Sequence, residues 1–359
     1  MPQPKGQRLL VVRNDKLGDF MLAWPALACL KQAHPDNHVS VLVPHYTAAL
    51  ARACPWVDEV LVDPGDDASR DVQRALLAQL RAGRFDALLT LFSTPRIGWL
   101  GWRAGIALRL APATKWAQVF HNRRIVQRRS RSQRPEYRYN LELAEALLTQ
   151  LGQPIPILEP PYWPLPTTMR GEQRQRLARE CGLDARRRWG FVHGGSGGSA
   201  VNLSPAHYAA LVASIDVRLD TPAEWVLTSG PGEHAAAAAL CDDLVDQGVA
   251  TRVMPPRDDL VDFAHSLSAA DLLIAGSTGP LHIAGCLDVP TVGFYPAKRS
   301  ATPLRWQTCN RDAHRLAFSP PADEHATDMS RIDIEAAAQA IADWWPAPTA
   351  SPMPATGSR

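Results

Sequence analysis

Three observations predict an α/β protein of two domains. The chain has 359 residues, which is long for a single domain and sufficient for two. Short apolar runs alternate with segments of helical periodicity, a pattern typical of parallel sheets. Residues 153–168 contain six prolines, a density that excludes helix and central strand. We therefore expect domains at 1–153 and 169–345, a linker at 154–168, and a disordered tail at 346–359.

The expected elements follow from periodicity and from helix start and stop signals. In the first half, strands are predicted at 9–12, 39–43, 59–62 and 86–92, with helices at 20–32, 45–54, 72–82 and 138–152. In the second half, strands are predicted at 189–192, 225–228, 271–274 and 290–295, with helices at 170–181 and 261–270.

The loop after the first strand is the first candidate site, with the sequence Arg-Asn-Asp-Lys-Leu-Gly-Asp at 13–19. In open α/β sheets, ligands bind at the carboxyl ends of strands, where such loops lie. Gly18 would allow a sharp turn or the close approach of a ligand. Asp19 would begin the helix, either as a functional carboxylate or as a simple N-cap. The absence of Gly-x-Gly-x-x-Gly argues against a dinucleotide site.

Loops of the second half form further candidate sites. Residues 193–199 read His-Gly-Gly-Ser-Gly-Gly-Ser, so their N–H groups could cradle phosphate or the loop could simply be flexible. Residues 276–282, Gly-Ser-Thr-Gly-Pro-Leu-His, end a strand and open a helix whose N–H groups would face an anion. His282 is either a ligand contact or a satisfied core histidine. Glu233 is either a ligand contact or an acid of a helix first turn.

An arginine-rich block spans residues 121–138, with seven arginines and a single acid, Glu136. Such a block is a solvated face or a set of phosphate clamps, because arginine binds phosphate oxygens in a bidentate way. Apart from Tyr137, no aromatic residue interleaves with the arginines to stack bases, which argues against a nucleic-acid partner. Arg96, at the end of the fourth strand, lies in another loop that faces the presumed cleft or forms a plain turn.

Two motifs resemble those of glycosyltransferase family 9, the bacterial heptosyltransferases. They are Arg13-x-Asp15-x-Leu17-Gly18-Asp19, followed by Trp24-Pro25-Ala26-Leu27, and Ser277-Thr278-Gly279-Pro280-x-His282. The resemblance covers roughly residues 8–300. It implies a GT-B fold, in which two Rossmann-like domains face a cleft. It also implies inverting transfer of heptose from ADP-heptose to an anionic, lipid-linked acceptor of the lipopolysaccharide inner core.

The resemblance assigns roles to individual residues. It implies that Asp19 is the general base. It implies donor binding by Gly194, Gly195, Ser196, Gly197, Glu233, Ser277, Thr278, Gly279 and His282. With an anionic acceptor, it favours acceptor contacts from Arg13, Lys16, Gly18, Arg96, Arg123, Arg124, Arg128 and Arg138.

The chain departs from the family pattern at two donor positions. Val201 stands where the family has a lysine, and Ser277 replaces the family's aspartate. Two alternatives therefore remain: a glycosyltransferase of the same fold with another donor or acceptor, and a catalytically weak nucleotide-sugar-binding protein. The chain has no Asp-x-Asp pair, so we expect neither a metal nor another cofactor beside the nucleotide-sugar co-substrate.

Composition limits the remaining functional classes. A formal charge of +2 does not by itself indicate nucleic acid. The six cysteines show no Cys-x-x-Cys spacing, which predicts reduced thiols in the cytosol. No apolar run reaches the ~20 residues needed to span a bilayer. We expect a cytoplasmic protein, and peripheral contact with the cytoplasmic face of the inner membrane is left open, as is the oligomeric state.

Overall fold

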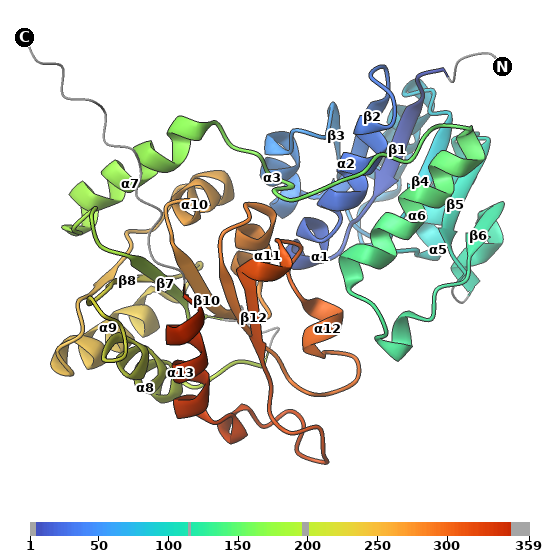
Figure 1. Ribbon diagram of the computed structural model, residues 1–359. Coiled ribbons are helices and arrows are strands. Elements are labelled where there is room, and N and C mark those ends of the chain that lie inside the picture. The colour runs from blue at the N-terminus through green and yellow to red at the C-terminus, as the bar shows by residue number, and fades with distance from the viewer. Residues whose placement is uncertain (1–4, 114–115, 196–200, 346–359) are drawn as a thin grey trace, which may run out of the picture.

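The computed structural model describes residues 5–113, 116–195 and 201–345. It confirms the predicted fold class, because two α/β domains each contain a six-stranded sheet with parallel pairing throughout (Figure 1). The chain between them, residues 154–166, has neither helix nor strand and passes from one domain to the other. Residues 346–359, predicted as a disordered tail, lie outside the described residues.

The N-terminal sheet has the strand order β3-β2-β1-β4-β5-β6. Its strands are β1 (Arg8–Val12), β2 (His38–Pro44), β3 (Glu59–Asp63), β4 (Ala87–Thr90), β5 (Leu108–Pro112) and β6 (Arg123–Ile125). The order reverses between β1 and β4, so the loops after these two strands flank the crevice where doubly wound sheets bind ligands. The loop that holds the first motif therefore lies at the point where the strand order reverses, the switch point of the sheet.

The helices of this domain depart from the prediction at the first helix, at 45–47, where a 3₁₀ turn replaces helix, and at Arg96, which lies in a helix (Pro95–Arg103) and not in a loop. They are α1 (Leu17–Met21), α2 (Trp24–Gln32), α3 (Ala48–Ala53), α4 (Arg70–Ala82), α5 (Pro95–Arg103) and α6 (Glu136–Leu151), with 3₁₀ turns η1 (His45–Thr47), η2 (Trp116–Phe120) and η3 (Arg129–Arg131). The single helix predicted at 20–32 is wrong, because α1 and α2 divide it. Pro25 lacks an N–H group and therefore occupies the first turn of a new helix.

The C-terminal sheet repeats the same topology, with the order β12-β11-β10-β7-β8-β9. Its strands are β7 (Trp189–His193), β8 (Glu224–Thr228), β9 (Thr251–Val253), β10 (Leu272–Gly276), β11 (Thr291–Phe294) and β12 (Arg315–Phe318). Its helices are α7 (Thr167–Cys181), α8 (Pro205–Asp216), α9 (His234–Asp246), α10 (Leu260–Leu267), α11 (Gly279–Cys286), α12 (Pro303–Trp306) and α13 (Ile334–Trp344), with η4 (Asp312–His314) and η5 (Met329–Arg331). The switch point lies between β7 and β10, beside the second motif.

The two domains are joined by apolar packing near the linker. Helix α1 packs against α11, and one cluster of buried apolar residues runs through both domains. The linker residue Trp163 contacts both sides: its ring lies 4.8 Å from that of Trp24, and its backbone N–H donates to the backbone oxygen of Cys286 at 2.7 Å. No helix within the described ranges is long and apolar enough to cross a membrane.

Candidate functional site

A cleft of about 1240 Å³ lies between the domains, at the two switch points. The N-terminal domain lines it with Lys16, Leu17, Gly18, Asp19 and Tyr46. The C-terminal domain contributes residues after β7, β8, β9, β10 and β11, among them Glu233, Ser277, Thr278, Gly279 and His282. The cleft thus brings together both motifs from the sequence, although 258 positions separate Asp19 from Ser277 (277 − 19).

The two motifs touch through their glycines. A Cβ atom on Gly18 would lie 2.7 Å from Cδ2 of His282, and one on Gly279 would lie 2.6 Å from Cδ2 of Leu17. Both distances are shorter than carbon atoms tolerate. Gly18 and Gly279 therefore allow the backbones of α1 and α11 to approach closely across the domain boundary.

Asp19 is the third residue of α1, and its carboxylate lies at the edge of the cleft. The N-cap of this helix is Lys16, so the alternative that Asp19 is a simple N-cap is wrong. The side chain is 14% exposed and forms an ion pair with Arg13. Burial raises the pKa of Asp19; Arg13 opposes this rise, and the nearby negative charge of Glu136 adds to it. The group is a carboxylate with increased basicity.

The buried Arg13 side chain forms an ion pair with the Asp19 carboxylate. Only 3% of its side chain is exposed, and its nitrogen atoms contact Asp15 at 2.8 Å, Glu136 at 3.3 Å and Asn140 at 3.3 Å in addition to Asp19. Arg13 was predicted to contact the acceptor, but its side chain is buried. Its contacts instead fit a residue that supports the Asp19 carboxylate. Burial raises the pKa of Asp15 to about 6.

Helix α11 presents its N-terminus to the cleft. Thr278 is its N-cap, and Gly279 and Pro280 form its first turn, so the N–H groups at this end face the ligand space. His282 follows one turn later and is 3% exposed. Burial lowers its pKa to about 4, which keeps the ring neutral. Its Nδ1 has no hydrogen-bond partner among the described residues, which does not fit a satisfied core histidine.

The glycine-rich loop after β7 packs against Glu233. A Cβ on Gly195 would fall 1.9 Å from a carboxylate oxygen of Glu233, so a larger residue there would require the Glu233 side chain to move. Glu233 accepts a hydrogen bond from the N–H of Gly230 at 2.9 Å. It occupies the N-cap position of α9, so the alternative of a first-turn acid is wrong. Gly194 precedes this contact; the predicted contacts of Ser196 and Gly197 lie outside the described residues.

Two cationic residues of the cleft were missed by the sequence analysis. Arg257 follows β9, and Lys298 follows β11; both line the cleft. The Arg257 side chain is 4% exposed and pairs with Glu180 at 2.7 Å, while its Nε has no partner among the described residues. Val201 also lines the cleft, at the position of the family's lysine. The sequence could have indicated them through their positions, because both cations lie in loops that follow predicted or observed strands.

The predicted acceptor arginines divide into two groups. Arg96 is paired with Asp63 at 2.6 Å and with Asp66. The exposed group lies outside the cleft lining and consists of Arg123, Arg124, Arg128 and Arg138. The first two belong to β6, the strand at the edge of the N-terminal sheet. The role of this group toward an acceptor stays a prediction.

Glu136 and Arg305 were also missed as site residues. Glu136 is 1% exposed and lies beside three arginines, at positions 13, 129 and 305. The sequence did contain a signal, because Glu136 is the single acid of the arginine-rich block. In the described ranges, no group of three His, Cys, Asp or Glu side chains is arranged to hold a metal ion.

The chain is similar to known proteins. The model of "Glycosyltransferase family 9 (heptosyltransferase)" matches residues 73–328. A Haemophilus influenzae protein named "Putative glycosyltransferase" is 44% identical over 330 residues, which cover 92% of this chain and 94% of that protein. The structure of the E. coli ADP-heptose lps heptosyltransferase II has a TM-score of 0.71 at 17% identity, covering 94% of this chain and 97% of that one. An E. coli heptosyltransferase with ADP-2-deoxy-2-fluoro heptose gives 0.69 at 18% identity, covering 94% and 99%.

Proposed function

This chain belongs to glycosyltransferase family 9, and from that premise we propose that it transfers heptose from ADP-heptose to a lipopolysaccharide inner-core acceptor. One observation carries the proposal. The carboxylate of Asp19 lies at the cleft, and the adjacent Gly18 packs directly on His282 of the helix whose N-terminus faces the same space. A base and an anion-binding helix end therefore flank one ligand site.

The proposed reaction is an inverting displacement at the anomeric carbon. Asp19 accepts the proton of the acceptor hydroxyl as its oxygen attacks the sugar, a general-base role. Arg13 fixes the orientation of the Asp19 carboxylate, and burial keeps the group basic. The C–O bond to the diphosphate breaks as the new bond forms, which inverts the configuration.

The departing diphosphate needs positive charge and hydrogen-bond donors. We assign this role to the N–H groups at the start of α11 and to Arg257 and Lys298, the cations that line the cleft. These two side chains would take over from the family's lysine, whose place Val201 occupies. Glu233 would contact the nucleotide ribose. No step of this scheme uses a metal ion.

The comparisons support the donor class. A heptosyltransferase of the same fold has been solved with ADP-2-deoxy-2-fluoro heptose, which makes a nucleotide sugar the natural ligand for this cleft. The exposed arginines of the N-terminal domain would contact the anionic acceptor. We expect this contact at the cytoplasmic face of the inner membrane.

A second candidate function is favoured by the two donor-side replacements. Val201 and Ser277 both line the cleft, so the loss of the family's lysine and aspartate changes the surface that meets the donor. A glycosyltransferase with another nucleotide or sugar would retain Asp19 and the α11 N-terminus but recognise different sugar hydroxyls. A weakly catalytic binding protein would also be stabilised by a nucleotide sugar but would form no product.

The deciding experiment combines binding and turnover. The melting temperature of the protein is measured with ADP-heptose, other ADP-sugars and UDP-sugars, and each stabilising donor is then offered with an inner-core acceptor. The main proposal predicts the largest increase with ADP-heptose, together with product. A larger increase and product with another sugar nucleotide would select the second candidate. Stabilisation without product from any donor would leave a binding protein.

A further inference from the structure

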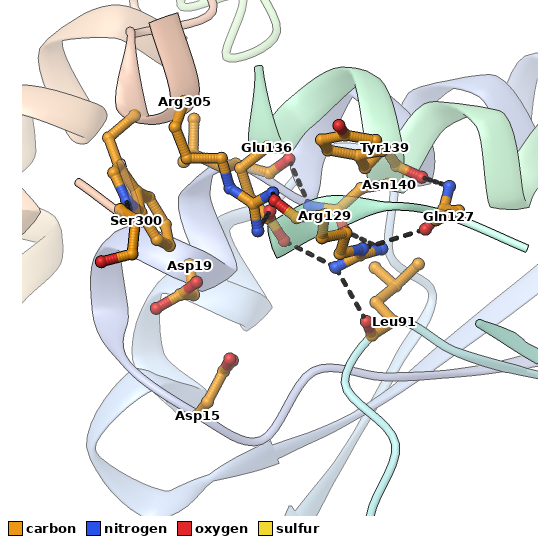
Figure 2. Close-up of polar contacts among 12 residues, drawn as sticks. Asp15, Asp19, Leu91, Gln127, Arg129, Glu136, Tyr139, Asn140, Ser300 and Arg305 are labelled. Carbon is orange, nitrogen blue, oxygen red and sulfur yellow. Dashed lines mark hydrogen bonds and ion pairs between the residues drawn. The ribbon is translucent and has the colours of Figure 1, made fainter. Parts of the chain in front are cut away.

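Arg305 connects the two domains beside the cleft. It lies in α12 of the C-terminal domain, and 11% of its side chain is exposed. Its Nη1 donates a hydrogen bond to the backbone oxygen of Arg129 at 2.8 Å, and its Nη2 forms an ion pair with Glu136. The guanidinium also lies over the ring of Tyr139, 5.0 Å from its centroid. All three partners belong to the N-terminal domain, as Figure 2 shows.

Glu136 links Arg305 to the proposed base. One oxygen of its carboxylate, Oε1, accepts from Arg129 at 2.7 Å and from Arg13 at 3.3 Å, while Oε2 faces Arg305. Arg13 in turn holds Asp19. Arg305 therefore reaches the Asp19 carboxylate through only two charged residues.

The segment that carries Arg305 also lines the cleft. Lys298, Ser300 and Trp306 belong to the lining, and the indole N–H of Trp306 donates to the backbone oxygen of Ser300 at 2.9 Å. A ligand in the cleft thus contacts the segment from which Arg305 extends to the other domain. Burying several charges at a domain interface costs more than apolar packing would, so stability alone does not explain this chain of ion pairs.

We propose that Arg305 is a positioning residue that orients the Asp19 carboxylate through Glu136 and Arg13 when a nucleotide sugar occupies the cleft. The inference rests on the proposed function for its ligand and its reaction. The contacts themselves predict one electrostatic consequence that does not require turnover. Removal of Arg305 leaves the negative charge of Glu136 less compensated, so the pKa of Asp19 should rise.

Other groups also set the charge around Asp19. Those that face it from its own and neighbouring elements are Arg13, Asp15, Lys16, Tyr46, Glu136 and, from α11, His282. None of these changes in an Arg305 variant, so a shift in the titration of Asp19 reports the loss of Arg305. A shift on the order of half to one pH unit is expected for a single charge at this remove.

The test uses Arg305→Gln, Arg305→Lys and the control Arg331→Gln in the full-length chain. Arg331 pairs with Asp323 on the surface of the same domain, at 2.6 Å, and does not line the cleft. Asp19 is titrated by ¹³C NMR of carboxyl-labelled aspartate, with Asp19→Asn identifying its signal. Donor-induced stabilisation, kcat and the acidic limb of kcat/KM are measured alongside.

We expect Arg305→Gln to raise the Asp19 pKa, move the acidic limb to higher pH and lower kcat at least tenfold, with donor-induced stabilisation unchanged. Arg305→Lys retains the charge, so its titration should match the wild type while kcat falls less. Arg331→Gln should change none of these. An Asp19 titration in Arg305→Gln that coincides with the wild type would overturn the inference, whatever the turnover. Absence of wild-type turnover would overturn the proposed function instead, and the titration would still decide this inference.

Discussion

Replacing Gly18 by alanine tests the contact between the two motifs. The new Cβ would lie 2.7 Å from Cδ2 of His282, whereas carbon atoms in ordinary contact are 3.4–4 Å apart. His282 is 3% exposed and belongs to α11, so it cannot turn away into solvent. One of the two helices must therefore move by several tenths of an ångström or more.

The cost follows from overpacking, which destabilises by about 1–3 kcal/mol. The better helix propensity of alanine offsets up to about 1 kcal/mol of this. We expect a net loss of about 1–2 kcal/mol, seen as a melting temperature lower by several degrees. Because a displacement of ~1 Å at a reacting group can cost on the order of 10²-fold in rate, turnover should fall by more than stability alone explains.

Gly171→Ala is the matched control. Gly171 lies within α7, and a Cβ there would meet no atom within 4 Å. This variant should gain about 0.5–1 kcal/mol from helix propensity and retain full turnover. Thermal unfolding and steady-state kinetics of both variants decide the question. If Gly18→Ala were as stable and active as Gly171→Ala, α1 and α11 would not be packed as described.

Three further outcomes are expected. Burial lowers the pKa of His282 from 6.5 to about 4, so its stabilising contribution is complete above pH 6.5 and is lost as the pH falls through 4. Between pH 7 and 4, thermal unfolding should show the wild type losing up to about 3 kcal/mol more than His282→Gln; parallel losses would contradict the neutral, buried ring. Turnover should survive excess EDTA, and a loss restored by Mg²⁺ or Mn²⁺ would show that the diphosphate needs a metal. Replacing the exposed arginines by glutamine should raise the acceptor KM, and the wild-type KM should rise with salt; an unchanged KM would leave them a solvated surface. The positions to replace are 123, 124, 128 and 138, and Arg129, which pairs with Glu136, is kept.

The strongest predictions from the sequence were those tied to strand ends. The apolar runs at 9–12 and 271–274 identified β1 and β10, and parallel topology then brought residues 13–19 and 276–282 to one edge each. Gly18 also predicted a close approach to the backbone. The sequence could not show that the partner would be His282 of the other domain. Hydrophobic periodicity predicted one helix where the structure has α1 and α2. The position of Pro25 did not reveal where the second helix begins, because proline is tolerated anywhere in the first turn.

The supports of the site could not be predicted, because they depend on how the domains meet. Glu136 and Arg305 are 169 positions apart (305 − 136), and nothing local in either segment specifies that they pair. Likewise, an arginine-rich block does not reveal which guanidinium turns inward. Arg129 does so and reaches Glu136, while Arg128 beside it stays exposed.

The central claim is that Asp19 is the base of a sugar transfer. Turnover of Asp19→Asn with ADP-heptose and an inner-core acceptor tests it most directly. The variant keeps the shape of the side chain and removes the proton acceptor. We predict that kcat falls by about 10²-fold or more, the scale of general-base catalysis, while donor-induced stabilisation stays at the wild-type level. Near-normal turnover in a folded, donor-binding Asp19→Asn protein would contradict the account.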